Sequence, residues 1–239
     1  MIPPGLTDEP GVATVADNVA AVRARMDRAA QECGRDPAAV TLIAVSKVQS
    51  DARVDAALHA GHRVFGENRV QEAQARWQPR RASWPDLRLH LIGPLQTNKV
   101  RDAVALFDVI ETVDRPKLAH ALAAEMARLG RRPDCFIQVN TGDEPQKAGV
   151  AWDALDDLVR MATQDCGLPV VGLMCIPPID DPPAPHFALV ADAAARLGLS
   201  QVSMGMTGDF EAAIHQGATQ VRVGTAVFGA RPPASPRAG

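Results

Sequence analysis

Tyrosine is absent from all 239 residues, and aromatic residues of every kind make up only 4% of the chain. Chemistry that needs a tyrosine acid or base from this chain is therefore excluded. Long apolar runs are also missing, and none approaches the roughly 20 residues that cross a bilayer as a helix. The N-terminus lacks the basic, apolar and cleavage-site series of a secretory signal. We therefore expect a cytoplasmic protein with no membrane partner.

Charge and cysteine content give no sign of a nucleic acid or a metal. The formal net charge is -3, so no overall field would recruit nucleic acid. The four cysteines show neither a CxxC pair nor a Cys/His metal spacing, and no HExxH motif is present. Cys135 and Cys175 stand in apolar runs, so we expect them to be core residues rather than disulfide partners.

The apolar pattern alternates between strand and helix along the chain. Helical spacing predicts a first helix over 12–33, ended by Gly34. Short apolar or β-branched runs predict eight strands, at 41–47, 63–65, 87–92, 109–112, 135–140, 170–174, 201–204 and 220–223. Seven helices are predicted between them, at 51–60, 67–77, 96–107, 115–129, 152–164, 186–197 and 210–215.

This alternation indicates an α/β protein with a parallel sheet, and eight units in about 200 residues suit a closed (β/α)8 barrel. A closed (β/α)8 barrel has eight outer helices, and the extra N-terminal helix could supply the eighth. We expect a single-domain TIM-type barrel over 11–230. A flexible N-terminus over 1–10 and a flexible, Pro/Ser-rich tail over 231–239 would flank it.

The first predicted strand ends at Ser46-Lys47. A lysine at the rim of a sheet can lose its proton because partial desolvation disfavours the ammonium form. The neutral amine is the group that forms a Schiff base with an aldehyde. The segment by itself favours the simpler interpretation that Lys47 marks a strand end exposed to water. In a barrel, however, functional residues collect at the carboxyl ends of the strands, which gives Lys47 neighbours in space.

The last two strand ends carry glycines and hydroxyls, in Ser203-Met204-Gly205 and Gly224-Thr225. Strands seven and eight of a barrel commonly build a phosphate site from backbone N–H groups and a hydroxyl. The alternative is that these glycines only make tight turns. A phosphate site beside a rim lysine suggests pyridoxal 5'-phosphate (PLP), which needs both an amine and a phosphate anchor.

Other polar residues near the strand ends leave two interpretations open. Arg222 interrupts an apolar strand, and it could face the pyridine nitrogen as a donor or pair with a carboxylate such as Glu67 or Glu111. Asn68, like Asn140, could line the pocket or cap a helix. His90 lies in the third strand, where a lone histidine is usually a satisfied core residue.

These residues fall within segments that resemble the pyridoxal phosphate homeostasis protein family. The matching segments run in order from about residue 12 to 231, and they include LIAVSK (42–47), FGENRVQE (65–72), HLIGPLQTNK (90–99), QVN (138–140), GLM (172–174), SMGM (203–206) and VRVGTAVFG (221–229). Val48-Gln49-Ser50 departs from the usual Thr-Lys-Pro-like segment after the lysine. This departure could alter the flexibility of the loop over the Schiff base.

The resemblance implies a barrel of the alanine racemase N-terminal type, also called fold-type III. It implies PLP held as a Schiff base on Lys47, Arg222 near the pyridine nitrogen, and a phosphate around Ser203, Gly205, Gly224 and Thr225. Family members are thought to bind and deliver PLP, to keep the free aldehyde low, and to lack robust catalytic activity. PLP-dependent apo-enzymes would then be recipients, and we expect a monomer.

Two alternatives to a carrier involved in vitamin B6 homeostasis stay open at this stage. One is a fold-type III PLP enzyme such as an amino-acid racemase. Racemases of that type pair the lysine with a tyrosine from a second domain, and we expect this chain to supply neither tyrosine nor second domain. The other is a phosphate-binding barrel without PLP, in which Lys47 forms an imine with a substrate.

Overall fold

The computed structural model describes residues 11–144 and 146–230, so the predictions for 1–10 and 231–239 fall outside the described residues. Its sheet is a closed barrel in which parallel strands follow one another in chain order, and β8 closes the sheet on β1. The strands are β1 (Thr41–Val45), β2 (Val64–Glu67), β3 (Arg88–Leu91), β4 (Val109–Val113), β5 (Asp134–Val139), β6 (Val170–Cys175), β7 (Gln201–Ser203) and β8 (Gln220–Val223). The predicted (β/α)8 barrel is confirmed.

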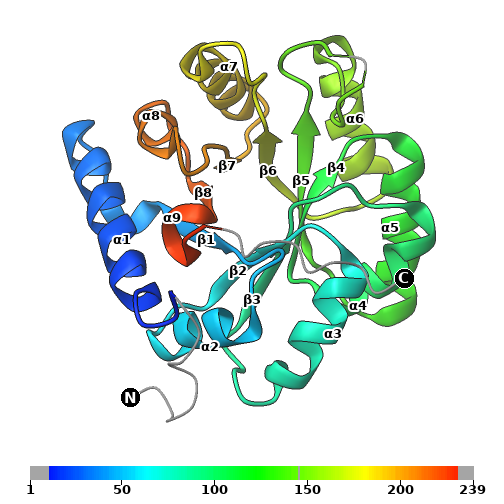
Figure 1. Ribbon diagram of the computed structural model, residues 1–239. Helices are drawn as coiled ribbons and strands as arrows, with labels where there is room; N and C mark the ends of the chain where they lie inside the picture. The colour runs from blue at the N-terminus through cyan, green and yellow to red at the C-terminus, as the bar shows by residue number, and fades with distance from the viewer. Residues whose placement is uncertain (1–10, 145, 231–239) are drawn as a thin grey trace.

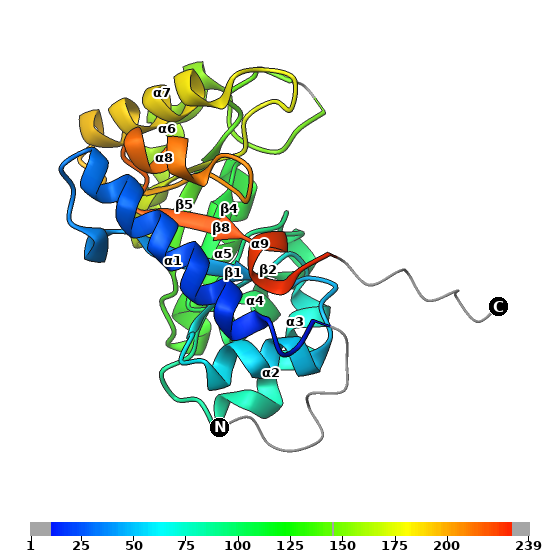
Figure 2. The same cartoon turned by 60° about the vertical axis from the view of Figure 1, so that its left-hand side comes forward.

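Helices surround the barrel, and the N-terminal helix completes the ring (Figure 1). The longer helices are α1 (Val15–Glu32), α2 (Asp51–His59), α3 (Val70–Arg81), α4 (Val100–Leu106), α5 (Pro116–Leu129), α6 (Leu155–Arg160), α7 (Pro183–Arg196) and α8 (Phe210–His215). Figure 2 shows α1 running across the outside of β1 and β8. Arg25 of α1 pairs with Glu211 of α8 at 2.8 Å. The N-terminal helix therefore packs beside α8 and supplies the eighth outer helix, as predicted.

Two of the predicted helices are divided in the structure, and the helix predicted at 67–77 is shifted to 70–81. The segment predicted at 96–107 splits into a 3-10 turn (Thr97–Lys99) and α4. The segment predicted at 152–164 becomes a 3-10 turn (Trp152–Ala154), α6 and a π-helical turn (Met161–Asp165). In that turn the Thr163 hydroxyl donates to the Val159 carbonyl oxygen at 2.7 Å and competes with the backbone ladder.

Proline and a strand end explain the remaining differences. α7 begins at Pro183, inside a stretch predicted as loop, because proline is tolerated in the first turn of a helix. A short helix, α9 (Thr225–Phe228), follows β8 directly and was not predicted. A 3-10 turn (Pro37–Ala39) precedes β1. None of these changes alters the order or the parallel pairing of the strands.

Side chains along the strands alternate between two buried regions, one between the strands and the helices and one inside the barrel. Most buried apolar side chains form one cluster between the strands and the helices, whereas Val109, Phe136 and Met174 form a small separate cluster. The residues that alternate with the outer cluster along the strands face the barrel interior. Several of these interior side chains are polar and nearly fully buried: His90, Glu111, Gln138, Ser203 and Arg222.

A hydrogen-bonded chain crosses the barrel interior from β3 to β8. His90 Nδ1 lies 2.6 Å from Glu111 Oε1, and the Ser203 hydroxyl donates to Glu111 Oε2 at 2.6 Å. Arg222 Nη1 donates to Ser203 Oγ at 2.7 Å and lies 4.0 Å from Glu111 Oε2. Burial alone would raise the pKa of Glu111, but His90, Arg222 and Ser203 together lower it below its usual value. The carboxylate is therefore held in its charged form inside the barrel.

A second buried titratable group, His62, lies at the opposite end of the barrel, just before β2. Arg23 Nη2 donates to its Nδ1 at 3.1 Å, and its Nε2 lies 2.7 Å from the Val64 carbonyl oxygen. An arginine can only donate and a carbonyl can only accept, so the ring is neutral with its proton on Nε2. Burial is the main cause that lowers the pKa of His62 to about 4.

The His62 environment predicts an acid-dependent loss of stability. The folded-state pKa lies below the unfolded value of 6.5, so the unfolded chain binds the extra proton and stability falls as the pH drops from 6.5 to about 4. The loss amounts to roughly 3 kcal/mol over this range. His62→Gln should flatten the slope in urea unfolding measured across it, while the exposed His59→Gln should keep the wild-type slope. Equal slopes in wild type and His62→Gln would contradict a neutral buried ring.

Glu111→Gln should destabilise the fold because it leaves Arg222 without its buried counter-charge. We expect a loss of about 3–5 kcal/mol in the free energy of unfolding at neutral pH. The lowered pKa of Glu111 contributes stability that is present above the usual glutamate pKa and is lost as the pH falls through the folded-state pKa. The variant has no carboxyl group at this position, so its free energy of unfolding should lack this decrease at acid pH.

Asp156→Asn is the matched control for Glu111→Gln, because it breaks an exposed carboxylate–arginine pair with Arg196. Its unfolding should stay close to that of the wild type. Indistinguishable unfolding curves for Glu111→Gln and Asp156→Asn would refute a structural role for the interior pair.

Candidate functional site

A pocket of about 280 Å³ opens at the carboxyl ends of the strands. This volume is slightly below the usual range for small-molecule sites, about 300–1,000 Å³. Its wall includes the side chains of Lys47, Asn68, Thr207, Arg222 and Thr225, together with Gly208 and Gly224. Apolar side chains complete it: Val45, Ile92, Ile176 and Met206. The pocket lies where the barrel fold places functional residues.

Lys47 reaches this pocket because of its position on the alternating pattern of β1. The strand ends at Val45, and Lys47 continues the face of Ile43 and Val45, whereas Ser46 lies on the other face. The Ser46 hydroxyl accordingly donates to Glu67 Oε1 at 2.8 Å, outside the barrel. Lys47 is half-buried at the rim. A primary amine is therefore placed at the wall of a small, partly open site.

Arg222 enters the pocket from β8, and β8 pairs directly with β1. The register sets Arg222 beside Ile43, so both side chains lie on the interior face. Its Nη2 donates to the Cys175 carbonyl oxygen at 2.7 Å and its Nη1 to Ser203. These bonds use two of its five N–H donors. Of the two carboxylates considered as partners, Glu111 is the one that lies near Arg222.

The end of β8 also contributes Gly224 and Thr225 to the pocket wall, at the start of α9. The first N–H groups of a helix have no partner within that helix, so they can donate to a bound group. The loop after β7 adds Thr207 and Gly208 to the lining of the same pocket.

Ser203 and Gly205 are not among the residues that line the pocket. Ser203 is fully buried, its hydroxyl donates to Glu111 Oε2 and it accepts a bond from Arg222, so it contacts the arginine beneath the pocket. Gly205 has a positive φ of 88°, and a Cβ there would come within 2.5 Å of the Ala213 Cβ in α8. Its glycine is explained by this close packing.

Asn68 and Asn140 have different roles in the structure. Asn140 shapes its own turn, because its side chain donates to the Glu144 carbonyl oxygen at 2.8 Å. Asn68 lines the pocket, and its buried Oδ1 has no hydrogen-bond partner among the described residues. His90 lies deeper, bonded to Glu111, and its Nε2 likewise has no partner in the described part of the chain.

Sequence reasoning missed Thr207 and Gly208 as pocket residues. A usable signal was present, since a Thr-Gly pair at a strand-seven end has the same composition as Gly224-Thr225. The apolar wall residues Ile92, Ile176 and Met206 gave no such signal, because strand ends and loops often carry apolar side chains.

A larger hollow of about 550 Å³ adjoins the pocket across Asn68. It lies between the start of α3 and the loop after β3, and Arg69 and Lys99 give it positive charge. It contains neither Lys47 nor the β8 residues. The smaller pocket is therefore the better candidate for covalent chemistry, because it joins an amine with a possible anion site.

The described residues contain no group of three or more His, Cys, Asp or Glu side chains placed to hold a metal ion. None of the helices in this part of the chain combines the length and the apolar character needed to span a membrane. The candidate site is thus defined by its lysine, its arginine and the backbone of two strand ends.

Comparison with known proteins connects this geometry to one group. The model of the alanine racemase N-terminal domain matches residues 18–232. A curated relative from Pseudomonas aeruginosa, named pyridoxal phosphate homeostasis protein, is 45% identical over 228 residues and covers 92% of this chain and 97% of its own length. A relative of the same name from Escherichia coli K12 is 37% identical, with 91% and 97% covered.

Solved structures agree with the sequence relatives. PipY of Synechococcus elongatus, described with PLP bound, is 38% identical, with a TM-score of 0.79 over 90% of this chain and all of that one. An alanine racemase from Corynebacterium glutamicum is 19% identical, with a TM-score of 0.65 over 95% of this chain and 64% of that one, and it shows the shared fold alone. The chain belongs to the pyridoxal phosphate homeostasis protein family.

Proposed function

We propose that this protein holds PLP as a Schiff base on Lys47 and serves intracellular PLP homeostasis and delivery, with little or no catalytic turnover. The observation that carries this proposal is the placement of Lys47, Arg222 and the Gly224-Thr225 strand end around one pocket of about 280 Å³. The names of the relatives, and the PLP bound to PipY, support the same cofactor.

The pocket residues divide the recognition of PLP between them. The Lys47 amine condenses with the aldehyde: a C=N bond forms, and the carbonyl oxygen leaves as water. The N–H groups and hydroxyls of Gly224, Thr225, Thr207 and Gly208 would hold the phosphate. PLP would supply the reactive aldehyde and the ring, and the protein would bind and orient them.

Arg222 would face the pyridine nitrogen. An arginine is a donor and has no proton to give up near neutral pH, so it would hydrogen-bond this nitrogen in its unprotonated form. An unprotonated ring is a weaker electron sink, which suits retention of the cofactor better than carbanion chemistry. In our proposal Ser203 and Glu111 position Arg222, while Asn68 lies in the wall, its buried Oδ1 without a hydrogen-bond partner in the part of the chain that the structure describes.

The competing proposal, a racemase, meets a chemical obstacle in this pocket. Two-base racemisation needs a second acid–base group opposite the lysine. The chain has no tyrosine, and apart from Lys47 the polar side chains that line the pocket in the described residues are Asn, Thr and Arg, none of which exchanges a proton readily near neutral pH. The composition of the wall therefore favours a carrier. Its recipients would be PLP-dependent apo-enzymes.

Lys47→Ala should abolish covalent PLP binding. Wild-type protein mixed with PLP should develop a visible absorbance band, and borohydride should remove that band and fix the cofactor to the Lys47 peptide in mass spectrometry. Lys117→Ala, which removes an exposed lysine of α5, is the matched control and should behave like the wild type. A colourless wild type with no mass gain after reduction would reject the PLP proposal.

Turnover separates a carrier from an enzyme. With PLP loaded, exchange of the alanine α-proton and racemisation of alanine should both stay well below about 1 per second, the lower end of ordinary enzyme rates. Transfer of PLP from the loaded protein to a PLP-dependent apo-enzyme should restore that enzyme's activity. Racemisation at ordinary enzyme rates would instead establish the racemase.

A further inference from the structure

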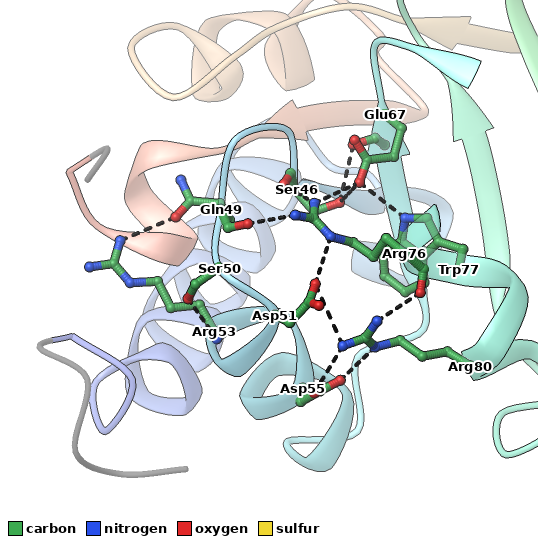
Figure 3. A network of polar contacts seen from close by, with 11 residues as sticks. Ser46, Gln49, Ser50, Asp51, Arg53, Asp55, Glu67, Arg76, Trp77 and Arg80 are labelled. Carbon is green, nitrogen blue, oxygen red and sulfur yellow. Dashed lines mark hydrogen bonds and ion pairs between the residues drawn. The ribbon is translucent and has the colours of Figure 1, made fainter. Parts of the chain in front are cut away.

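Two backbone carbonyl groups of the loop that carries Lys47, residues 46–50 between β1 and α2, accept hydrogen bonds from one side chain of α3. Arg76 Nη1 donates to the Ser46 carbonyl oxygen at 2.7 Å, and its Nη2 donates to the Gln49 carbonyl oxygen at 2.6 Å (Figure 3). These two carbonyl groups stand on either side of Lys47 and Val48 in the chain. A single planar guanidinium therefore fixes both ends of the segment that contains the reactive lysine.

The backbone between these two anchors is strained. Val48 has a φ of 55°, in the left-handed region, and its side chain is exposed. A β-branched residue rarely adopts this conformation, and it persists only where the surrounding structure imposes it. The exposed Val48 side chain has little packing of its own to enforce the turn. The bonds from Arg76 to the flanking carbonyl groups are placed to do so.

Arg76 is itself fixed by a buried carboxylate. Glu67 Oε1 accepts bonds from Arg76 Nη1 at 3.1 Å, from the Ser46 hydroxyl at 2.8 Å and from Trp77 Nε1 at 3.0 Å. Arg76 Nε also donates to Asp51 Oδ1 at 3.1 Å. Figure 3 shows the guanidinium of Arg76 lying between Glu67, Asp51 and the loop. The arginine is therefore part of a rigid, charge-assisted network rather than a flexible surface side chain.

We propose that Arg76 is a positioning residue for Lys47, which sets how firmly the lysine retains its aldehyde ligand. The inference rests on the proposed function, because it assumes that Lys47 binds PLP. A loop fixed in its bound conformation loses little freedom when the ligand binds, so retention is strong. When the anchors are removed, the strained turn relaxes, the amine moves away from its place at the pocket mouth, and release becomes faster.

The test compares two arginines one turn apart on α3. Arg80 pairs with Asp55 at 2.7 Å and donates to the Arg76 carbonyl oxygen, but it makes no bond to the loop carbonyl groups in the described structure. Arg76→Gln should release PLP at least about tenfold faster than the wild type, whereas Arg80→Gln should stay within about twofold. Release is followed by loss of the visible band after dilution into a carbonyl scavenger, and the melting temperature is recorded for both variants.

Two further variants keep the test decisive if Arg76→Gln folds poorly. Arg76→Lys retains the charge but cannot span two carbonyl groups and a carboxylate, so it should also release PLP faster than wild type. Val48→Gly keeps the anchors and removes the strain, so it should leave release no faster than in the wild type.

The outcomes separate this inference from the proposed function. A wild type without a Lys47-dependent band would reject the PLP function itself. A wild type with the band, beside Arg76→Gln and Arg76→Lys that release PLP at the wild-type rate, would overturn only the role of Arg76. Equal acceleration in Arg80→Gln would show that general loss of stability, not the loop anchors, governs release.

Discussion

Closure of the barrel between β8 and β1 is the constraint on which the site depends. The pairing sets Ile43 beside Arg222 and Ala44 beside Val223, although these strands stand at opposite ends of the chain. Because parallel strands end at the same rim, the lysine after β1 meets the glycine and threonine after β8. Any proposal that joins an amine to an anion site here relies on this one junction. The N-terminal helix α1 packs across it from outside, so the first helix of the chain covers the pair of strands that forms the site.

The alternation of side chains along β1 then assigns consecutive residues to different tasks. Ser46 faces the helices and joins the carboxylate of Glu67, while Lys47 faces the pocket. Two buried carboxylates thus each fix an arginine, Glu67 holding Arg76 outside the barrel and Glu111 lying close to Arg222 inside it. A buried charge that lost its partner would be costly, so both arginines are held in place by electrostatics rather than by packing alone.

Much of this could be predicted from the sequence, because strand ends are marked by composition. Lys47, Gly224 and Thr225 were predicted as site residues from their positions at strand ends. The site role of Arg222 stayed open until the family resemblance implied it, and the structure brings all four residues to one pocket. The phosphate role of Ser203 could not be judged in the same way, since a shift of one residue decides whether a side chain lies at the rim or beneath it. The partner of Arg222 stayed open because the predicted second strand ended at residue 65, which left the orientation of Glu67 undefined.

Arg76 lay beyond sequence reasoning for a different physical reason. A polar residue on an outer helix normally faces solvent, and nothing in the local pattern distinguishes Arg76 from Arg80 one turn later. The difference arises only when the loop after β1 folds against α3 and presents two carbonyl groups to one of them. In our proposal the backbone that Arg76 holds acts together with the ligand contacts in the pocket to set how firmly Lys47 retains its aldehyde. A pocket with one amine, a donor-only arginine and a rigid loop is better suited to keeping an aldehyde than to moving protons on it.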